Sequence, residues 1–219
     1  MSSITRRQAV SLAIALGCVA LAGRIWWVNE NAPANLPIVH HALGEPVELK
    51  GAFMATRDSE LTDGYTVCIQ DARLCSYNEF VLAYATDGRT PIEGFDTPSI
   101  VDTTWLIELD ESHERKGGLM IHEMILVPAR KNIYYAQNDQ LFVATQENLR
   151  KGGGRGVQIA IHPGTTYEIH APYTLPGGQQ VLVEDRYYPK YFAESIPDRS
   201  FELRLSNSPV CHLVDIDLT

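Results

Sequence analysis

Histidines and clustered acids are the side chains of this chain that could bind a metal ion, but their spacing fits neither a zinc nor an EF-hand motif. His40 and His41 are adjacent, so in an extended chain they point to different sides, and no third ligand follows at a zinc-like spacing. Residues 58–63 hold three acids in one loop, without the ligand spacing of an EF-hand. We therefore expect no metal ion and no other cofactor.

Motifs for nucleophilic catalysis and for phosphate binding are absent from the sequence. It contains neither the GxSxG of serine hydrolases nor the HExxH of zinc peptidases. Residues 151–156 are rich in glycine, but the Lys-Ser/Thr pair of a phosphate-binding loop does not follow. Asp185 and Asp198 could be the two carboxyl groups of a glycosidase, which requires a defined separation in space. We predict that the protein is not an enzyme; the alternative is a secreted or surface carbohydrate-active hydrolase that uses paired carboxylates.

The densest group of aromatic residues lies at residues 185–192. Aromatic side chains often bind carbohydrates or peptides, because each ring combines a large apolar face with a polar edge. They equally often cover the edge of a sheet. Three tyrosines of this group are candidate ligand contacts: Tyr187, Tyr188 and Tyr191.

Residues 9–28 form an apolar segment that determines where the protein is located. Arg24 is their only charged residue, and a helix of this length spans roughly 30 Å, the thickness of the hydrocarbon core of a bilayer. Basic residues before the segment keep residues 1–8 in the cytoplasm and place the rest of the chain outside. We predict a single-pass signal anchor in the cell membrane, with lipid as its partner. Five side chains are expected to hold it there: Arg6, Arg7, Arg24, Trp26 and Trp27.

Three other interpretations of the same segment stay open. Ala20-Leu21-Ala22 has the small-x-small form of a signal-peptidase site, so the segment could be cleaved after Ala22. Residues 15–18 resemble a bacterial lipobox, in which Cys18 carries the lipid. Residues 5–8 resemble the start of a twin-arginine export signal.

The net charge of the exported part excludes one class of partner. The whole chain has 219 residues and a net charge of −9, and its first 28 residues contain three arginines and no acid. The remainder therefore has a net charge of −12. Because so acidic a surface repels phosphate backbones, we expect no binding to nucleic acid.

The exported part contains three cysteines, Cys68, Cys75 and Cys211, so at most one intramolecular disulfide can form. In one continuous strand Cys68 and Cys75 would be about 23 Å apart, beyond the reach of a disulfide. Pairing of either one with Cys211 requires neighbouring strands. We favour free cysteines that pack as small apolar residues.

The pattern of apolar residues predicts an extracellular domain over residues 47–219, after a proline-containing linker over residues 29–46. The clearest strand covers residues 101–109, which alternate with a period of two. Further strands are predicted at residues 47–53, 65–75, 119–127, 140–144, 157–162, 165–171, 201–206 and 210–218, with a bulge or tight turn at residues 70–71.

One short helix is predicted after Ser76. Ser76 and Glu79 have the spacing of a capping box, and apolar residues follow at helical spacing. Short strands, frequent turns and a single short helix indicate a mainly β protein, an immunoglobulin-like antiparallel β-sandwich. A β-barrel is the alternative architecture.

Several short motifs resemble the domain of unknown function 5028 family, a family of bacterial surface proteins. The motifs are distributed along nearly the whole chain. They are residues 24–29 (RIWWVN), 63–65 (DGY), 76–80 (SYNEF), 91–96 (PIEGFD), 171–173 (APY), 198–201 (DRSF) and 206–210 (SNSPV). The resemblance implies a membrane-anchored extracellular β-sandwich and supplies no catalytic residues. We accordingly expect a non-enzymatic binding or interaction module of the bacterial cell envelope, whose partner is an envelope protein or a glycan.

Overall fold

The computed structural model describes residues 21, 23–26, 36–50, 62–113, 119–128, 134–146, 158–159, 161–175, 180–183, 186–189 and 199–218. The chain divides into two compact units, Met1–Leu36 and Pro37–Thr219. In the first unit Arg24 and Trp26 are helical, whereas Arg6, Arg7 and Trp27 lie outside the described residues, as does most of the predicted anchor. None of the helices in the described ranges is long and apolar enough to cross a bilayer.

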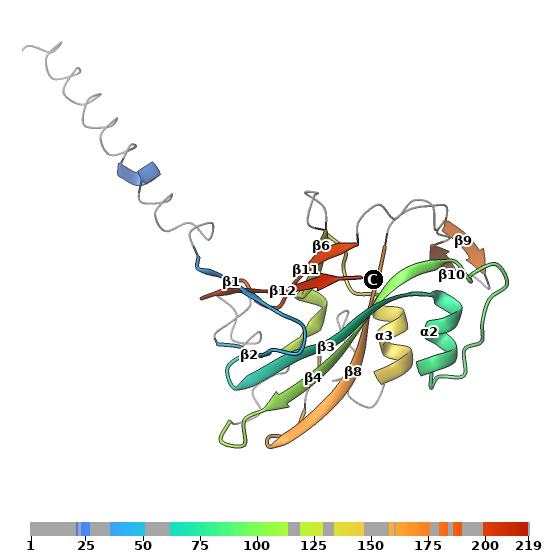
Figure 1. Ribbon diagram of the computed structural model, residues 1–219, viewed down its shortest axis with the longest axis horizontal. Coiled ribbons are helices and arrows are strands. Elements are labelled where there is room, and N and C mark those ends of the chain that lie inside the picture. Colours follow the sequence, from blue (N-terminus) through green and yellow to red (C-terminus); the bar gives the residue numbers. More distant parts are fainter. Residues whose placement is uncertain are drawn as a thin grey trace, which may run out of the picture. The chain divides into compact units, whose positions relative to one another are not determined.

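Three long strands form the centre of the second unit: β3 (Tyr65–Ser76), β4 (Pro98–Leu109) and β8 (Thr165–Thr174) (Figure 1). With the short strand β2 (Pro46–Glu48) they make a four-stranded antiparallel sheet in the order β2-β3-β4-β8, which we call the long-strand sheet. The strand predicted at residues 101–109 is confirmed, and burial alternates over residues 103–109, where Trp105, Ile107 and Leu109 are buried; Asp102 is buried as well. The register shifts between Ile69 and Asp71, so the predicted irregularity at residues 70–71 is a β-bulge within one strand.

A second four-stranded sheet has the order β1-β12-β11-β6, and we call it the mixed sheet. Its strands are β1 (Ile38–His41), β6 (Ile125–Pro128), β11 (Ser200–Arg204) and β12 (Cys211–Asp217). β1 pairs with β12 in parallel, whereas β11 is antiparallel to both of its neighbours. The structure therefore differs from two predictions: residues 38–41 of the predicted linker form a strand, and one strand pair is not antiparallel.

The two sheets enclose one hydrophobic core. One cluster of buried side chains includes Trp105 and Ile169 from the long-strand sheet and Phe201 and Val214 from the mixed sheet. A buried hydrogen bond joins β8 to the residue that precedes β6, because the Tyr173 hydroxyl donates to the backbone carbonyl of Met124 at 3.0 Å. Neither sheet closes on itself in the part of the chain that the structure describes, so the described fold is two open sheets rather than a barrel.

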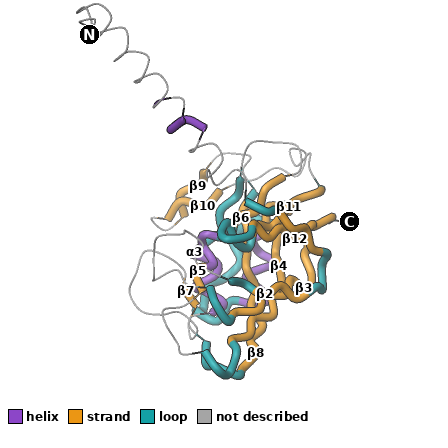
Figure 2. The backbone as a smooth tube through the Cα atoms, turned by 90° about the vertical axis from the view of Figure 1, so that its left-hand side faces the viewer, coloured by secondary structure: helices purple, strands orange, loops and turns teal. Residues whose placement is uncertain are grey.

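The predicted helix is α2 (Tyr77–Tyr84), and its capping box is confirmed. The Glu79 amide donates to Ser76 Oγ at 3.1 Å, and the Glu79 carboxylate accepts from the Ser76 amide at 2.7 Å. Phe80 and Val81 are buried in a second, smaller cluster of apolar side chains. Helices occupy only short stretches of the described chain (Figure 2).

Two predicted strands are wrong in part or entirely. Residues 140–144 lie in a second helix, α3 (Asp139–Gln146), because Asn138 caps it by accepting the Leu141 amide at 3.1 Å. Residues 119–127 are divided into β5 (Leu119–Met120), a turn of 3-10 helix, η3 (Ile121–Glu123), and β6.

The remaining strands form two short antiparallel pairs. β5 pairs with β7 (Gln158–Ile159), and β9 (Gln180–Val183) pairs with β10 (Arg186–Pro189). Cys68, Cys75 and Cys211 are free, as we favoured. Burial raises the pKa of the Cys75 thiol to about 12, so it packs as an apolar side chain.

Candidate functional site

The structure describes the tyrosines predicted as ligand contacts only in part. Tyr187 and Tyr188 belong to β10, where they pair with Leu182 and Val181 of β9. The structure describes their backbone but not their side chains, and Tyr191 lies outside the described residues, as do Asp185 and Asp198. The candidate sites with described geometry lie elsewhere, in three places.

The first is a pocket of about 610 Å³ at one end of the long-strand sheet. Its floor follows from register, because Glu48, Thr66 and Glu108 lie opposite one another on β2, β3 and β4. Their neighbours in each strand face the core, so these three face outward. Ten residues line the pocket: Glu48, Lys50, Asp63, Gly64, Thr66, Glu108, Asp110, Glu111, His113 and Gly164.

The pocket is strongly acidic. Five of its lining residues are carboxylates, and Lys50 is paired with one of them, since its Nζ lies 3.1 Å from Glu48 Oε2. Asp110 Oδ1 accepts hydrogen bonds from the Ser112 hydroxyl and amide, each at 2.7 Å, which lowers the pKa of Asp110 and keeps it ionised. The arrangement favours a cationic ligand.

Close backbone packing fixes the wall of this pocket. Gly64 has a φ of +81°, and a Cβ atom there would lie 2.4 Å from the His113 ring, so only glycine fits. The Asp110 amide donates to the Gly64 carbonyl at 2.9 Å, and the Gly164 amide donates to the Leu109 carbonyl at 2.7 Å. His113 Nδ1 is buried against this wall without a hydrogen-bond partner. These hydrogen bonds and the close packing at Gly64 therefore hold the wall in place.

The second place is a buried charge cluster centred on Asp102 of β4, which is only 1% exposed. Arg73 Nε of β3 donates to Asp102 Oδ2 at 3.1 Å, and His170 Nδ1 of β8 lies 3.3 Å from Oδ1. Arg73 also donates to the Tyr84 hydroxyl at 3.2 Å, and the Tyr84 ring stacks on His170 with centroids 3.7 Å apart. Because Tyr84 ends α2, the cluster holds that helix against the long-strand sheet.

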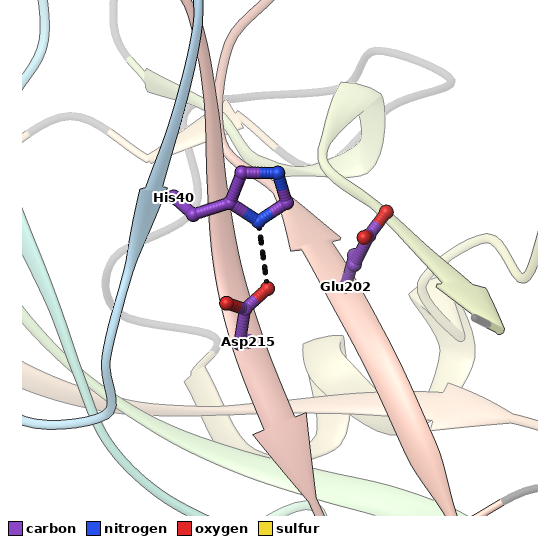
Figure 3. Close-up of side chains that lie close together, drawn as sticks. All are labelled: His40, Glu202 and Asp215. Atoms are coloured by element: carbon purple, nitrogen blue, oxygen red, sulfur yellow. Dashed lines mark hydrogen bonds and ion pairs between the residues drawn. The ribbon is translucent and has the colours of Figure 1, made fainter.

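The third place is on the exposed face of the mixed sheet. His40 Nδ1 lies 2.9 Å from Asp215 Oδ1, and one ligand atom each from His40, Asp215 and Glu202 all lie within 4.8 Å of one another (Figure 3). The hydrogen bond to Asp215 and the charges of Asp215 and Glu202 raise the pKa of His40. The imidazole is therefore protonated more readily than that of a free histidine.

His41 lies on the opposite side of β1. Its Nδ1 is 2.9 Å from Glu45 Oε1, and its Nε2 is 2.9 Å from His212 Nδ1. The two adjacent histidines thus point to different sides, as the sequence indicates. Two of their partners, His212 and Asp215, lie on β12, 171 and 175 residues along the chain, so spacing in the sequence could not reveal these contacts.

The comparison with known families gives one match. The model of a domain of unknown function, DUF5028, matches residues 38–212. The matched segment begins at the first residue of β1 and ends within β12, so it spans both sheets. No curated protein matches this chain, and no solved structure matches it.

Proposed function

The chain belongs to the DUF5028 family, a domain of unknown function, and from that premise we propose that it is a non-enzymatic binding module that takes a basic segment of an envelope protein into the acidic pocket. The sequence supports a place on the outer surface of the cell membrane, with residues 9–28 as the anchor. In this proposal the domain stands outside the membrane, where its pocket can meet other envelope components.

The pocket is the observation that carries this proposal. Its volume of about 610 Å³ lies within the range of roughly 300–1,000 Å³ that is typical of ligand sites. Its carboxylates lie on strands and turns that backbone hydrogen bonds hold in place, so a ligand meets them already oriented. A concave surface lined by charges of one sign also concentrates ligands of the opposite sign.

A lysine or arginine side chain of a partner protein is the ligand that fits best. Its ammonium or guanidinium group can bond several carboxylates at once, and its alkyl stem can lie along the wall. A neutral glycan can donate hydroxyl hydrogen bonds to these carboxylates, but it carries no positive charge to offset their negative charge.

We infer in addition that the two sheets form an immunoglobulin-like sandwich, because their strands share one core and their connections cross between sheets. Such a scaffold presents loops at its ends, and the pocket lies where turns meet at one end of the long-strand sheet.

Titration calorimetry of the full-length chain in detergent micelles tests the pocket, with hexalysine, hexaglutamate and soluble peptidoglycan fragments as probes. We expect hexalysine alone to bind, and more weakly at high salt. Glu108→Gln with Glu111→Gln should weaken binding roughly tenfold, or about 1.4 kcal/mol. The control, Asp71→Asn with Glu93→Gln, removes two exposed acids outside the pocket and should leave binding unchanged.

Three outcomes would overturn the proposal. An equal effect of both double variants would show attraction to the overall negative charge rather than to the pocket. Binding of peptidoglycan fragments alone would indicate a glycan module. Cleavage of those fragments would support the hydrolase that uses paired carboxylates.

A further inference from the structure

We propose that His40, Asp215 and Glu202 form a site for a divalent transition-metal ion of the zinc type on the exposed face of the mixed sheet. This site is separate from the acidic pocket, and it does not depend on the function proposed for that pocket.

The three ligands come from three adjacent strands, β1, β12 and β11. Glu202 and Asp215 are directly opposite in the antiparallel register, and His40 aligns with Leu213, two residues before Asp215 on β12. Side chains two residues apart in a strand share a face, so register alone brings the imidazole beside both carboxylates. Figure 3 shows the ring with one nitrogen directed at Asp215 and with Glu202 on the neighbouring strand.

The distances suit a small ion after minor adjustment. Ligand atoms at about 2.0–2.2 Å from zinc, in tetrahedral geometry, are roughly 3.3–3.6 Å apart. The three ligand atoms here lie within 4.8 Å of one another. The side chains of His40 and Asp215 are 48% and 56% exposed, so rotation about their side-chain bonds can bring the atoms to ligand distance. The backbone need not move, because strand hydrogen bonds already fix it.

A second observation independently favours a cation at this place. Glu202 and Asp215 are like charges on directly opposed positions, and such cross-strand pairs are destabilising. His40 hydrogen-bonds to only one of them, Asp215. A divalent ion between the two carboxylates offsets both charges, and a neutral imidazole can bind it through a ring nitrogen.

The ligand set distinguishes among ions. One imidazole nitrogen and two carboxylate oxygens suit zinc and its neighbours, whereas calcium prefers six to eight oxygen ligands. Three protein ligands leave a coordination position open for water or for a side chain of another molecule. The ion would also tie β1, an edge strand of four residues, across β12 to β11.

The nearest competing group is on the opposite side of β1. His41 bonds Glu45 through Nδ1 and His212 through Nε2, so these two partners lie at different nitrogens of one ring. A single ion cannot take the place of both bonds. His41 and His212 are nevertheless an alternative zinc site, and the experiment must distinguish it from the site at His40.

The experiment is calorimetric titration of zinc into the full-length chain, freed of metal by a chelator, held in detergent micelles and carrying no polyhistidine tag. We expect one zinc ion per chain and little response to calcium. His40→Ala and Asp215→Asn should each weaken zinc binding by at least about tenfold, the loss that even an outer-shell partner can produce. His162→Ala, which removes an exposed histidine elsewhere, should have no effect.

A second readout follows the strand itself. Zinc should slow hydrogen exchange of the β1 amides in the unchanged protein and in Glu108→Gln with Glu111→Gln, but not in His40→Ala. Circular dichroism confirms that each variant is folded, and Asp215→Asn changes only one oxygen of an exposed side chain.

Three results would overturn this inference. Unchanged zinc affinity in both His40→Ala and Asp215→Asn would remove the site. Loss of binding in His212→Ala with retention in Asp215→Asn would assign the ion to the His41 pair. No zinc binding by the unchanged protein would show that His40 and the two carboxylates do not form a metal site.

Discussion

Two groups of charged side chains in this protein use similar residues on three adjacent strands, yet the carboxylates at their centres differ in burial. In the long-strand sheet Asp102, Arg73 and His170 lie beneath α2, and the Asp102 side chain is 1% exposed. In the mixed sheet His40, Asp215 and Glu202 lie on an open face, with Asp215 56% exposed.

The difference shows that a buried charged group needs partners of opposite charge, whereas an exposed one does not. A buried carboxylate must be paired, because transfer from water to the interior is strongly unfavourable. Asp102 accordingly contacts Arg73 and His170, two basic partners from the strands on either side. On the exposed face water screens the charges, so two carboxylates can stand opposite each other with a single histidine. Only the second arrangement leaves room for a ligand.

Replacing Arg73 in the charge cluster around Asp102 should reduce the stability of the fold more than any other change proposed here. Arg73→Met leaves Asp102 buried with His170 as its remaining basic partner, and we expect a loss of about 3 kcal/mol in the free energy of unfolding. Lys50→Met is the matched control, since Lys50 is 69% exposed and pairs with an exposed glutamate. It should cost less than about 1 kcal/mol. Urea denaturation of the full-length chain, followed by circular dichroism, measures both, and equal losses would contradict the comparison.

Replacing His212, a half-buried histidine on β12, should have an intermediate effect on stability, and this effect should depend on pH. Burial, and then the charge of His41, lower the pKa of His212 below its usual 6.5. As the pH falls below about 6.5, the unfolded chain therefore binds a proton first, and the folded state loses stability. His212→Gln should remove this loss at acidic pH and leave stability near pH 8 little changed.

Thermal unfolding at a series of pH values between 5 and 8 measures this effect. His162→Gln serves as control, because it replaces an exposed histidine outside the mixed sheet. A pH profile of His212→Gln that parallels the unchanged protein would contradict the assigned direction of the pKa.

Replacing Glu202 on the exposed face should change stability least, and it should increase stability rather than reduce it. Glu202→Gln relieves the like-charge pair with Asp215, so in the presence of a chelator we expect a gain of less than about 1 kcal/mol. The same urea titration measures it. A clear loss of stability in the absence of metal would mean that neighbouring groups already offset the charges of the two carboxylates. The contrast between this exposed face and the buried Asp102 would then disappear.

Local chemistry explains which parts of the fold could be predicted. The strand at residues 101–109, the capping box at Ser76 and the irregularity at residues 70–71 each depend on a few neighbouring residues, and each is confirmed. The helix α3 was missed because Leu141, Phe142 and Val143 are a short apolar run that suits either a strand or a helix. β1 was missed because four residues at a sheet edge carry too little pattern.

The candidate sites could not be predicted in the same way. The acids of the pocket come from β2, β4 and two turns, and the ligands of the proposed metal site come from β1, β11 and β12. Each residue has an ordinary sequence context. Only the pairing of strands brings His40 within 2.9 Å of Asp215, 175 residues away.

The sequence by itself determined that this domain is mainly β, that it is acidic, and where its first helix begins, because these properties depend on composition and on residues close along the chain. Tertiary structure alone decided which carboxylates are buried and which face water. That choice depends on the register between distant strands, where a shift of one residue would exchange the two faces of a strand.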